Sequence, residues 1–491
     1  MSKNISAKKN DAALSLVVKI VALVCALVLL ASIALAVVAK NGYFRRNTVV
    51  MEIGDTEINA IEYNYGYYTA LNNFYSQYYY YASSLGFDPS TSLKSQDCYF
   101  DPEISWYDYF VNQTKTQFEE IYLIYNKAVE DGFTMTEESA KSLEDSIKDL
   151  ENAAKEAKMS VNKYLRSVYG PNITLNDYKE YVSRRLIFAD FCEKYMDGLS
   201  YPTEEIEKYY SDNKKDLDVV SYYVYTAKAD TKNEKTAEEI ANGIKDASTD
   251  VTSFLTALKG VVGEDTFEEK TYLTEGATYT KDDQASEWLF DDARKAGDVT
   301  VIKTAATSSA STDTYKVICF VERGRETYRL ATMRHILLSV TNLTNEDGST
   351  IKDESGKAKT NDAEQKAAAE ALLKQWKDGA ATQDSFAALV KDNSNDTGSV
   401  ENGGLYEDFD KKTMVSEITD WIWAEGRKEG DCEIVKTSYG YHLVYFVGYG
   451  EEKWNSDVVN TLKNNDYSDY LKELKEKYPV SFNDKGLSQV G

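Results

Sequence analysis

The sequence has few histidines, few prolines and little positive charge, and each shortage narrows the range of functions. Only two histidines, His335 and His442, occur in 491 residues. Metal sites draw on several histidine, cysteine or carboxylate ligands at regular spacings, so two isolated histidines predict no metal, and no cofactor is expected. Lys and Arg total 56 against 81 Asp and Glu, a net charge of −25, which argues against the basic surface that nucleic-acid binding needs.

Cysteine is scarce and scattered. No Cys-x-x-Cys pair is present, so zinc-finger spacing and a thioredoxin-type redox motif are absent. We favour unpaired buried thiols, while pairing in an oxidising compartment stays open because sequence does not fix connectivity. No serine or cysteine stands in a nucleophile elbow, which argues against a hydrolase. The five cysteines are Cys25, Cys98, Cys192, Cys319 and Cys432.

One apolar run near the start predicts a membrane segment. Residues 20–39 contain no charged side chain, and at 1.5 Å per residue they span about 30 Å, the thickness of a bilayer core. Basic residues flank both ends and set no orientation, but a large trailing domain usually lies outside. We predict a cytoplasmic tail at 1–14 and an uncleaved signal anchor at 15–40. Cleavage after Ala36 is the alternative, and lipid attachment at Cys25 is disfavoured by Val24.

The region from residue 48 to residue 218 has mainly helical patterning. A hairpin is expected at 48–58, and helix starts and breaks then predict the helices 106–131, 136–157, 160–169 and 174–197. Tyrosines are dense between residues 63 and 81. We favour a core helix whose hydroxyls reach solvent, although adaptable contact with irregular partners is the alternative.

Residues 219–324 and 329–450 repeat each other in order. Each copy begins with a β-rich run, continues through a similar Trp-containing segment and ends in a strand. In this alignment Tyr222 matches His335, and Lys316 matches His442. The first copy therefore lacks both histidines, and any chemistry that depends on them is expected only in the second.

The second copy resembles the parvulin family of peptidyl-prolyl isomerases over about 120 residues. Two motifs depart from the family: Leu405-Tyr406-Glu407 follows the double glycine where Asp-Leu-Gly is usual, and Ile418 replaces the pocket phenylalanine. The matching motifs are Arg334-His335-Ile336-Leu337, Ser394-Asn-Asp396-Thr-Gly-Ser399, Gly403-Gly404, Met414 and Thr437-Ser-Tyr-Gly-Tyr-His442.

The resemblance implies a site for rotation about X-Pro bonds. Rotation about an amide has a barrier of about 18–20 kcal/mol, and a catalyst needs an apolar proline pocket rather than a nucleophile. By resemblance the catalytic residues are His335, Asp396 and His442, with the histidines hydrogen-bonded on adjacent strands and Asp396 beside the rotating carbonyl. The expected substrate-binding residues are Met414, Ile418, Phe409, Trp423, Tyr441 and Thr437.

The expected fold class is α+β. A helix after the isomerase unit resembles the SurA-like and PrsA-like extracytoplasmic foldases, in which the two ends of the chain build one mainly helical chaperone lobe. After the anchor, we expect a helical chaperone domain at 48–218, completed by a C-terminal helix and tail at 451–491 that pack on the same lobe. Between them we expect an inactive parvulin-like domain at 219–327 and a parvulin-type isomerase domain at 328–450. Each of these two domains is expected to have a small antiparallel sheet flanked by helices.

The predicted function is a single-pass cell-membrane foldase with its soluble domains outside the cytoplasm. Its partners would be unfolded or partly folded secreted polypeptides that contain X-Pro bonds, and the bilayer through the anchor. Two alternatives stay open: a holdase whose parvulin-like units only bind peptide, and a cell-envelope scaffold.

Overall fold

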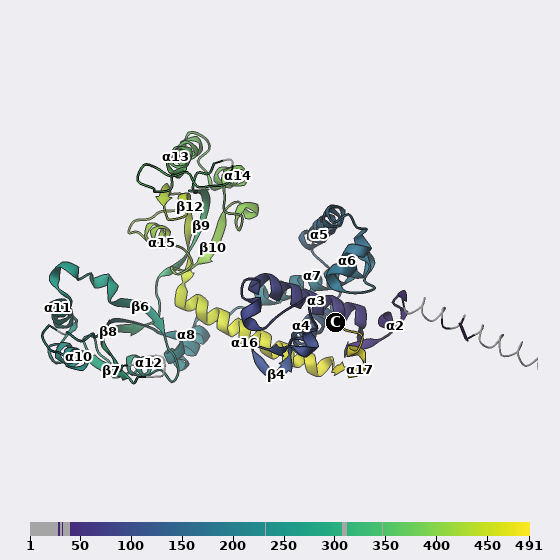
Figure 1. Ribbon diagram of the computed structural model, residues 1–491, viewed down its shortest axis with the longest axis horizontal. Helices are drawn as coiled ribbons and strands as arrows, with labels where there is room; N and C mark the ends of the chain where they lie inside the picture. Colours follow the sequence, from purple (N-terminus) through teal and green to yellow (C-terminus); the bar gives the residue numbers. More distant parts are fainter. Residues whose placement is uncertain (1–27, 30–31, 33–39, 231, 307–311, 346) are drawn as a thin grey trace, which may run out of the picture. The chain divides into compact units, whose positions relative to one another are not determined.

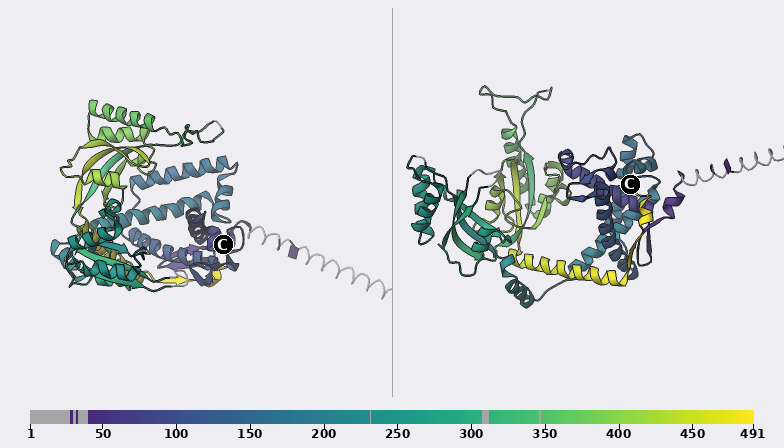
Figure 2. Two further views of the ribbon diagram at one scale, coloured as in Figure 1. Left: turned by 60° about the vertical axis from the view of Figure 1, so that its left-hand side comes forward. Right: turned by 60° about the horizontal axis from the view of Figure 1, so that its bottom comes forward.

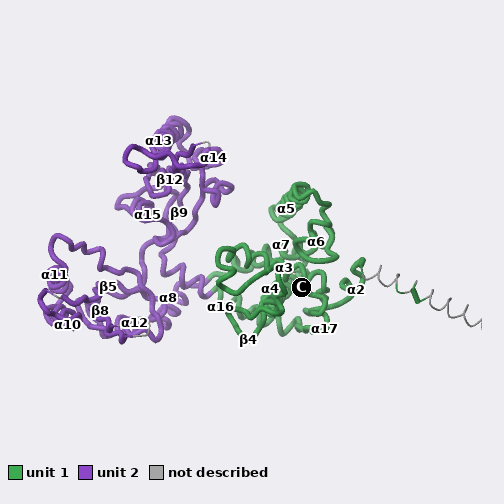
Figure 3. Tube along the Cα trace, viewed as in Figure 1, with its two compact units in different colours: residues 1–200, 463–491 green, residues 201–462 purple. Residues whose placement is uncertain are grey.

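The computed structural model describes residues 28, 29, 32, 40–230, 232–306, 312–345 and 347–491. The chain forms two compact units, residues 1–200 with 463–491 and residues 201–462 (Figure 3). Apart from Val28, Leu29, Ser32 and Lys40, the predicted anchor at 15–40 lies outside the described residues, and no helix among those described is long and apolar enough to cross a bilayer. The α+β class is confirmed: the N-terminal region is mostly helical, and small antiparallel sheets with helices follow.

The first unit is built from helices around a small sheet of three strands in the order β13-β1-β2 (Figures 1 and 2). The strands are β1 (Val49–Ile53), β2 (Thr56–Asn59) and β13 (Val480–Phe482), and a second pair is β3 (Asp97–Cys98) and β4 (Asp101–Ser105). The helices are α2 (Tyr43–Arg46), α3 (Ala60–Tyr78), α4 (Trp106–Glu130), α5 (Glu137–Glu156), α6 (Val161–Tyr169), α7 (Leu175–Gly198) and α17 (Asp484–Leu487), together with the end of α16 (Lys453–Lys477).

Aromatic side chains form the core of the first unit. Helix α3 begins where the side chain of Asn59 accepts two backbone N–H groups, and α4 begins at a capping box between Ser105 and Asp108. These starts direct Tyr63 of α3 and Trp106 of α4 into one core, where neither is exposed. The tyrosine-dense run therefore divides: its first half packs in the core, while residues 79–81 at the end of α3 are exposed.

The end of the chain completes this unit. Strand β13 pairs antiparallel with β1, with Met51 opposite Phe482, although more than 400 residues separate them. Leu474 of α16 and Val490 lie in the same core as Trp106. Segments from both ends of the chain thus bury one another's apolar faces.

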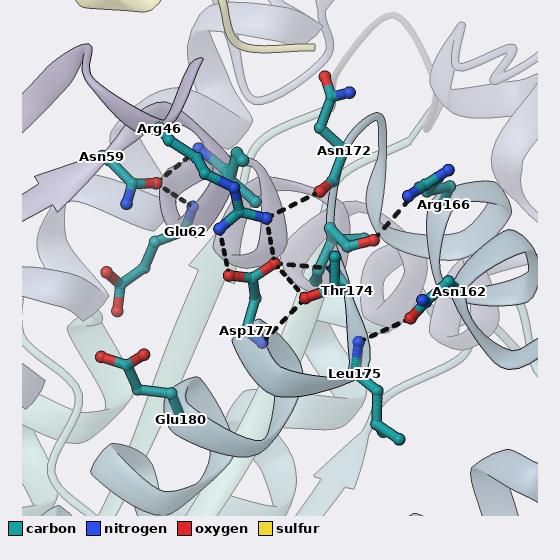
Figure 4. A network of polar contacts seen from close by, with 12 residues as sticks. Arg46, Asn59, Glu62, Asn162, Arg166, Asn172, Thr174, Leu175, Asp177 and Glu180 are labelled. Atoms are coloured by element: carbon teal, nitrogen blue, oxygen red, sulfur yellow. Dashed lines mark hydrogen bonds and ion pairs between the residues drawn. The ribbon is translucent and has the colours of Figure 1, made fainter. Parts of the chain in front are cut away.

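A buried carboxylate holds the start of the described chain to helix α7 (Figure 4). Asp177 closes the capping box of α7 with Thr174 and accepts hydrogen bonds from both terminal nitrogens of Arg46 in α2, at 2.5 and 2.6 Å. Arg46 also donates to the backbone oxygen of Asn172 at 3.2 Å. Burial alone would raise the pKa of Asp177, but the hydrogen bonds from Arg46 and Thr174 outweigh it and lower the pKa.

The second unit contains two four-stranded antiparallel sheets with the same strand order, β6-β5-β8-β7 and β10-β9-β12-β11. The first sheet has β5 (Val219–Thr226), β6 (Leu273–Thr278), β7 (Val299–Thr304) and β8 (Thr314–Gly324), with helices α10 (Ala237–Asp246), α11 (Val251–Val262) and α12 (Gln284–Leu289). The second has β9 (Arg329–Ser339), β10 (Leu405–Phe409), β11 (Cys432–Lys436) and β12 (Gly440–Glu452), with α13 (Asp362–Asp378), α14 (Gln383–Asn393) and α15 (Ser416–Ile422). Helices α8 (Thr203–Asp212) and α9 (Lys214–Leu217) precede the first sheet.

The repeated strand order confirms that one fold is used twice, but the strand register corrects one predicted equivalence. In the second sheet, His335 pairs with Val444. The residue of the first sheet that is equivalent to Val444 is Ile318, and Ile318 pairs with Val224. Val224, and not Tyr222, therefore stands in the position of His335. The predicted equivalence of Tyr222 is wrong because β5 is irregular between Ser221 and Tyr222, which the sequence does not reveal, whereas the pairing fixes the register. Lys316 keeps its predicted equivalence to His442, since Ile302 pairs with Lys316 as Val435 pairs with His442.

We predict that Asp177→Asn loosens the first unit. The change leaves the Arg46 guanidinium without its charged partner. Because the Arg46 side chain is 37% exposed and solvent screens the pair, we expect a cost of about 1 kcal/mol. Hydrogen–deuterium exchange of the α7 amides measures this as a lower free energy of opening. The matched control is Asp145→Asn, because Asp145 and its partner Lys148 are both exposed; it should change the opening free energy by less than about 0.5 kcal/mol. Equal effects of both changes would contradict the role of the Arg46–Asp177 pair.

Candidate functional site

The two histidines lie on the two central strands of the second sheet. His335 is on β9 and His442 on β12, and both side chains are buried, with 5% and 4% of their surface exposed. Side chains alternate along a strand, so the histidines share a sheet face with Met333, Val444 and Phe446, while helices α13 and α14 cover the opposite face. Both imidazoles therefore lie on the sheet face on which α15 packs through Ile418 and Ile422.

A chain of hydrogen bonds runs through both imidazole rings. The Nε2 atom of His335 lies 2.7 Å from Oδ2 of Asp396, and the two Nδ1 atoms of His335 and His442 are 3.2 Å apart. The Nε2 atom of His442 lies 2.9 Å from Oγ1 of Thr437, which also accepts the backbone N–H of Tyr439 at 3.1 Å. All four ring nitrogens thus have a partner, as burial of polar groups requires.

The loop after α14 positions Asp396 beside β9. The backbone N–H of Asn395 donates to the carbonyl of Leu337 at 2.8 Å. The loop thus continues the hydrogen bonding along β9 beyond the end of β10. Farther along, the N–H of His335 donates to the carbonyl of Gly404 at 2.9 Å. Gly404 has φ +73°, and a Cβ atom there would lie 2.3 Å from the backbone oxygen of His335. Only glycine allows this approach, which explains the double glycine next to the site.

The site holds an ionised carboxylate beside two neutral imidazoles at neutral pH. Burial would raise the pKa of Asp396, but hydrogen bonds from Ser399, His335 and Tyr406 outweigh it and lower the pKa to about 2. Burial, together with a smaller contribution from the neighbouring His335, lowers the pKa of His442 to about 4. Burial also lowers the pKa of His335, although Asp396 opposes the shift. Desolvation therefore keeps both rings uncharged.

These charge states determine the direction of every hydrogen bond in the chain. An ionised Asp396 only accepts, so His335 must carry its proton on Nε2, which leaves Nδ1 as an acceptor. His442 must then donate from Nδ1, and its Nε2 must accept from the hydroxyl of Thr437. One arrangement of protons satisfies the whole chain, and both rings are held in a single tautomer.

Apolar side chains line the same sheet face. Ile418 and Phe409 are 2% and 5% exposed, whereas Met414 and Trp423 are half-buried. Phe409 lies opposite Ala331 in the register, four residues along β9 from His335, or roughly 13 Å at the usual rise. Of the expected pocket residues, Met414 and Trp423 thus have surface that a ligand can reach, while Ile418 and Phe409 form the floor beneath them.

Two expected substrate-binding residues lie elsewhere. Tyr441 is on the opposite sheet face, where it packs in the core beneath α13 and donates from its hydroxyl to Asp362 at 3.0 Å. Its neighbour His442 faces the other way because successive strand residues alternate. Thr437 is 4% exposed and bonded to His442, so it positions that ring and does not line the pocket.

Two residues that the sequence analysis left without a role support Asp396. The hydroxyls of Ser399 and Tyr406 both donate to Oδ2 of Asp396, Tyr406 at 2.9 Å, and the Tyr406 ring meets the His335 ring edge-on. The role of Ser399 could have been predicted, because Ser399 belongs to the same sequence motif as Asp396. The role of Tyr406 could not, because Tyr406 falls in the triplet that departs from the family.

This arrangement suits binding and polarisation better than bond cleavage. The imidazoles are neutral, and every ring nitrogen has a partner. The hydroxyl of Thr437 donates to His442, but Thr437 is only 4% exposed, so this hydroxyl does not reach a substrate as a nucleophile must. Among the described residues, no group of three or more His, Cys, Asp or Glu side chains is placed to hold a metal ion. A buried polar chain next to an apolar surface can orient an uncharged group.

Comparison with known proteins agrees with the resemblance. Residues 335–448 match the family model of the PPIC-type PPIase domain, a rotamase domain. A foldase protein PrsA from Exiguobacterium sibiricum is 28% identical over 138 residues, 26% of this chain and 44% of that protein. Foldase protein PrsA 1 from Bacillus cereus is 34% identical over 94 residues, 19% of this chain and 32% of that protein. The chain thus spans less than half the length of these curated relatives.

A solved structure, that of PrsA from Bacillus subtilis, is 14% identical and is matched over 78% of this chain and 92% of that one, with a TM-score of 0.29. The chain contains a PPIC-type parvulin rotamase domain, and PrsA foldases are among its sequence relatives.

We predict that Thr437→Val destabilises the domain but leaves the proton order unchanged, because Asp396 fixes that order from the other end of the chain. Valine has nearly the same shape but no hydroxyl, so the buried Nε2 of His442 loses its donor, at a cost of about 1–3 kcal/mol in the free energy of unfolding. Nitrogen-15 NMR should find Nε2–H on His335 and Nδ1–H on His442 in both proteins, with the Nε2 signal of His442 shifted in the variant. The control Thr360→Val removes an exposed hydroxyl and should leave the histidine signals unchanged. A proton on Nε2 of His442 in the unchanged protein would disprove the assigned proton order.

We predict that stability of this domain falls as the pH drops from about 6.5 toward 4. The pKa of His442 is lowered to about 4 and that of His335 is lowered too, so in this window the unfolded chain binds protons that the folded domain does not. Each such proton lowers the free energy of unfolding by about 1.4 kcal/mol per pH unit. Urea unfolding of residues 328–450 at pH 7, 6 and 5 measures the slope. His442→Gln, with one titrating ring fewer, should give a shallower slope; an equal slope would refute the assignment.

Proposed function

We propose that this chain is a membrane-anchored extracytoplasmic foldase that isomerises X-Pro bonds and holds unfolded secreted polypeptides. The observation that carries the proposal is the chain of hydrogen bonds from Asp396 through His335 and His442 to Thr437, beside an apolar sheet face. The PPIC-type match over residues 335–448 supports the same reaction.

The reaction needs only that the twisted amide be favoured over the planar one. A planar amide is polar, with negative charge on oxygen and positive charge on nitrogen, and rotation about the C–N bond removes this resonance. An apolar, water-poor surface therefore disfavours the planar form more than the twisted form, which lowers the barrier. In this proposal Met414 and Trp423 contact the proline ring over the floor formed by Ile418 and Phe409.

Asp396 acts in this scheme through its charge. Three donors hold its Oδ2 atom, while among the described residues Oδ1 accepts only a long contact from the N–H of Gly398 at 3.3 Å. A carboxylate beside the substrate carbonyl repels the negative charge of the planar amide, and that charge fades as the bond twists. His335 and His442 would be positioning residues that fix Asp396 and exclude other proton arrangements.

The remaining parts are assigned by the same reasoning. We propose that residues 48–218 and 451–491 form the chaperone lobe, that 219–327 is an inactive parvulin-like domain, and that 15–40 anchors the chain in the cell membrane. The first sheet has Val224 and Lys316 in the histidine positions. Neither of these two residues has a ring that could take part in such a chain of hydrogen bonds.

A proline-peptide assay tests the reaction. Residues 328–450 should accelerate cis-to-trans conversion of a peptide whose X-Pro bond limits a fluorescence change. Asp396→Asn removes the charge beside the substrate carbonyl, and His442→Ala leaves the buried Nδ1 of His335 without its donor. Each change should lower the rate constant about tenfold or more, since about 1.4 kcal/mol of lost transition-state stabilisation is a factor of ten. In the full chain, Lys316→Ala is the matched control, since Lys316 occupies the His442 position of the first sheet; it should leave the rate unchanged.

The outcomes separate the proposed functions. An inactive domain with a native circular dichroism spectrum would overturn the isomerase and leave the holdase. An active domain with full activity in Asp396→Asn would keep the isomerase and remove the proposed role of the carboxylate.

A further inference from the structure

The chain that follows the proposed anchor is bound tightly to the first unit. The apolar run ends at residue 39, and the backbone of Gly42 is in the left-handed region, with φ +79°. A Cβ atom at Gly42 would lie only 2.6 Å from the Cβ atom of Asn172, which belongs to the loop 170–174 between α6 and α7. The backbone therefore meets this loop almost directly after the end of the apolar run.

Asn172 makes most of the hydrogen bonds at this contact (Figure 4). Its side-chain N–H donates to the carbonyl of Lys40 at 2.9 Å, and its side-chain carbonyl accepts from Arg45 at 3.1 Å. Its backbone carbonyl accepts from Arg46, which also pairs with Asp177. Asn172 has φ +73°, a conformation that asparagine adopts more readily than most residues. One loop residue thus fixes the chain at residues 40, 45 and 46.

This contact limits how far the first unit can lie from a bilayer. The chain from residue 39 to Gly42 spans at most about 11 Å when fully extended. Because residues 20–39 are proposed to cross the bilayer, Gly42 and the loop packed against it lie at the bilayer surface. The first unit is then held against the lipid headgroups through this loop.

The aromatic side chains at this contact suit a membrane interface. Tyr43 and Phe44 of α2 are 58% and 44% exposed, and their rings meet edge-on at 5.8 Å between centroids. Tyrosine and tryptophan concentrate at the level of the headgroups, where a ring has apolar chains on one side and water on the other. The pair stands at the point of the chain where that environment begins.

Basic side chains surround the aromatic pair. Lys40 and Arg166 are exposed and Arg45 is half-buried, and in the described part of the chain none of the three forms an ion pair. Arg166 belongs to this surface because its Nε atom donates to the carbonyl of Ile173 in the loop, at 3.4 Å. The chain as a whole carries a net charge of −25. Unpaired positive charge at this place favours an anionic surface, to which the rest of the chain would be repelled.

From these observations we propose that residues 40–46, the loop 170–174 and Arg166 form a surface that docks on the anionic headgroups of the membrane in which the chain is anchored. The aromatic pair enters the interface, and the basic side chains contact lipid phosphates. The inference rests on the proposed anchor, and it gives the first unit a fixed attachment to the bilayer in place of a free tether.

The test uses the full-length protein in lipid nanodiscs of two compositions, phosphatidylcholine alone and phosphatidylcholine with the anionic lipid phosphatidylglycerol. A photoreactive benzoylphenylalanine replaces Phe44 in one protein and Tyr80 in another. Mass spectrometry measures the fraction of each protein that cross-links to lipid. In anionic nanodiscs, position 44 should cross-link about fivefold more than position 80, and more than position 44 does in neutral nanodiscs.

Tyr80 is the matched control for exposure without proximity. It is 91% exposed and follows the end of α3, a helix of 19 residues and about 28 Å. The start of α3 lies beside the end of α2, because the N–H of Ala60 donates to the carbonyl of Thr48 at 2.9 Å. Position 80 is therefore at the far end of α3 from the proposed docking surface.

Charge substitutions identify what binds the headgroups. Arg45→Gln with Arg166→Gln removes two unpaired charges from the surface. Each basic side chain near an anionic membrane strengthens binding by about fivefold, so lipid cross-linking from position 44 in anionic nanodiscs should fall at least about threefold. Both side chains reach solvent, so the fold should survive, and an unchanged circular dichroism spectrum checks this.

The control for these substitutions is Lys141→Gln with Lys194→Gln, which removes two exposed positive charges elsewhere on the same unit. Lys194 lies about 26 Å along α7 from Asp177. Lys141 lies near that same end of α7, because the hydroxyl of Ser139 donates to Asp190 at 2.6 Å. Cross-linking from position 44 should change less than about twofold.

The outcomes separate docking from anchoring. Equal cross-linking of position 44 in both lipid compositions, or an equal fall for the two pairs of substitutions, would overturn recognition of anionic headgroups. Cross-linking of position 44 to a second copy of the chain in place of lipid would make the surface a self-association site and overturn the proposal.

Extraction with alkaline carbonate tests the anchor itself. If the protein leaves the membrane, the anchor is wrong and the docking surface falls with it. If the protein resists extraction while position 44 cross-links no more lipid than position 80, the anchor stands and the docking surface alone is wrong. Neither result bears on the proline-peptide assay, so the proposed isomerase is judged separately.

Discussion

The constraint on which the second sheet depends is that four buried imidazole nitrogens must all be paired. A buried polar atom without a partner costs about 1–3 kcal/mol, so the pair is stable only if the carboxylate, the two rings and the hydroxyl form one uninterrupted chain. The burial of Thr437 beside His442 meets that requirement at one end. At the other end, the backbone hydrogen bond from Asn395 to Leu337 holds the loop that brings Asp396 to His335.

The first sheet demonstrates that the fold itself does not need this chain. It has the same strand order, yet Val224 and the exposed Lys316 occupy the two histidine positions. Apolar packing under α12 holds that face together. Because an apolar replacement of a buried polar network is commonly neutral or stabilising, the network in the second sheet has no structural necessity. Its presence is better explained by what it does to a ligand on the adjacent apolar surface.

Local motifs allowed the α+β class and the histidine pair to be predicted, because strand neighbours and glycine-dependent turns leave short signatures. What failed depended on register or on side-chain direction. Tyr222 was matched to His335 because strand irregularities do not appear in the sequence, and Tyr441 was assigned to the pocket although it alternates with His442 to the other face. Tyr406 was hidden because a tertiary contact, and not a motif, gives it its role.

One charged group stands beside the otherwise apolar face of the second sheet. The chain as a whole carries a net charge of −25, so a charged site would accept or reject ligands according to their own charge and to the salt concentration. The apolar sheet face would interact instead through packing, which salt screens little. Asp396 is the exception: three donors hold its charge at the point where, in the proposed reaction, it would act on a single amide.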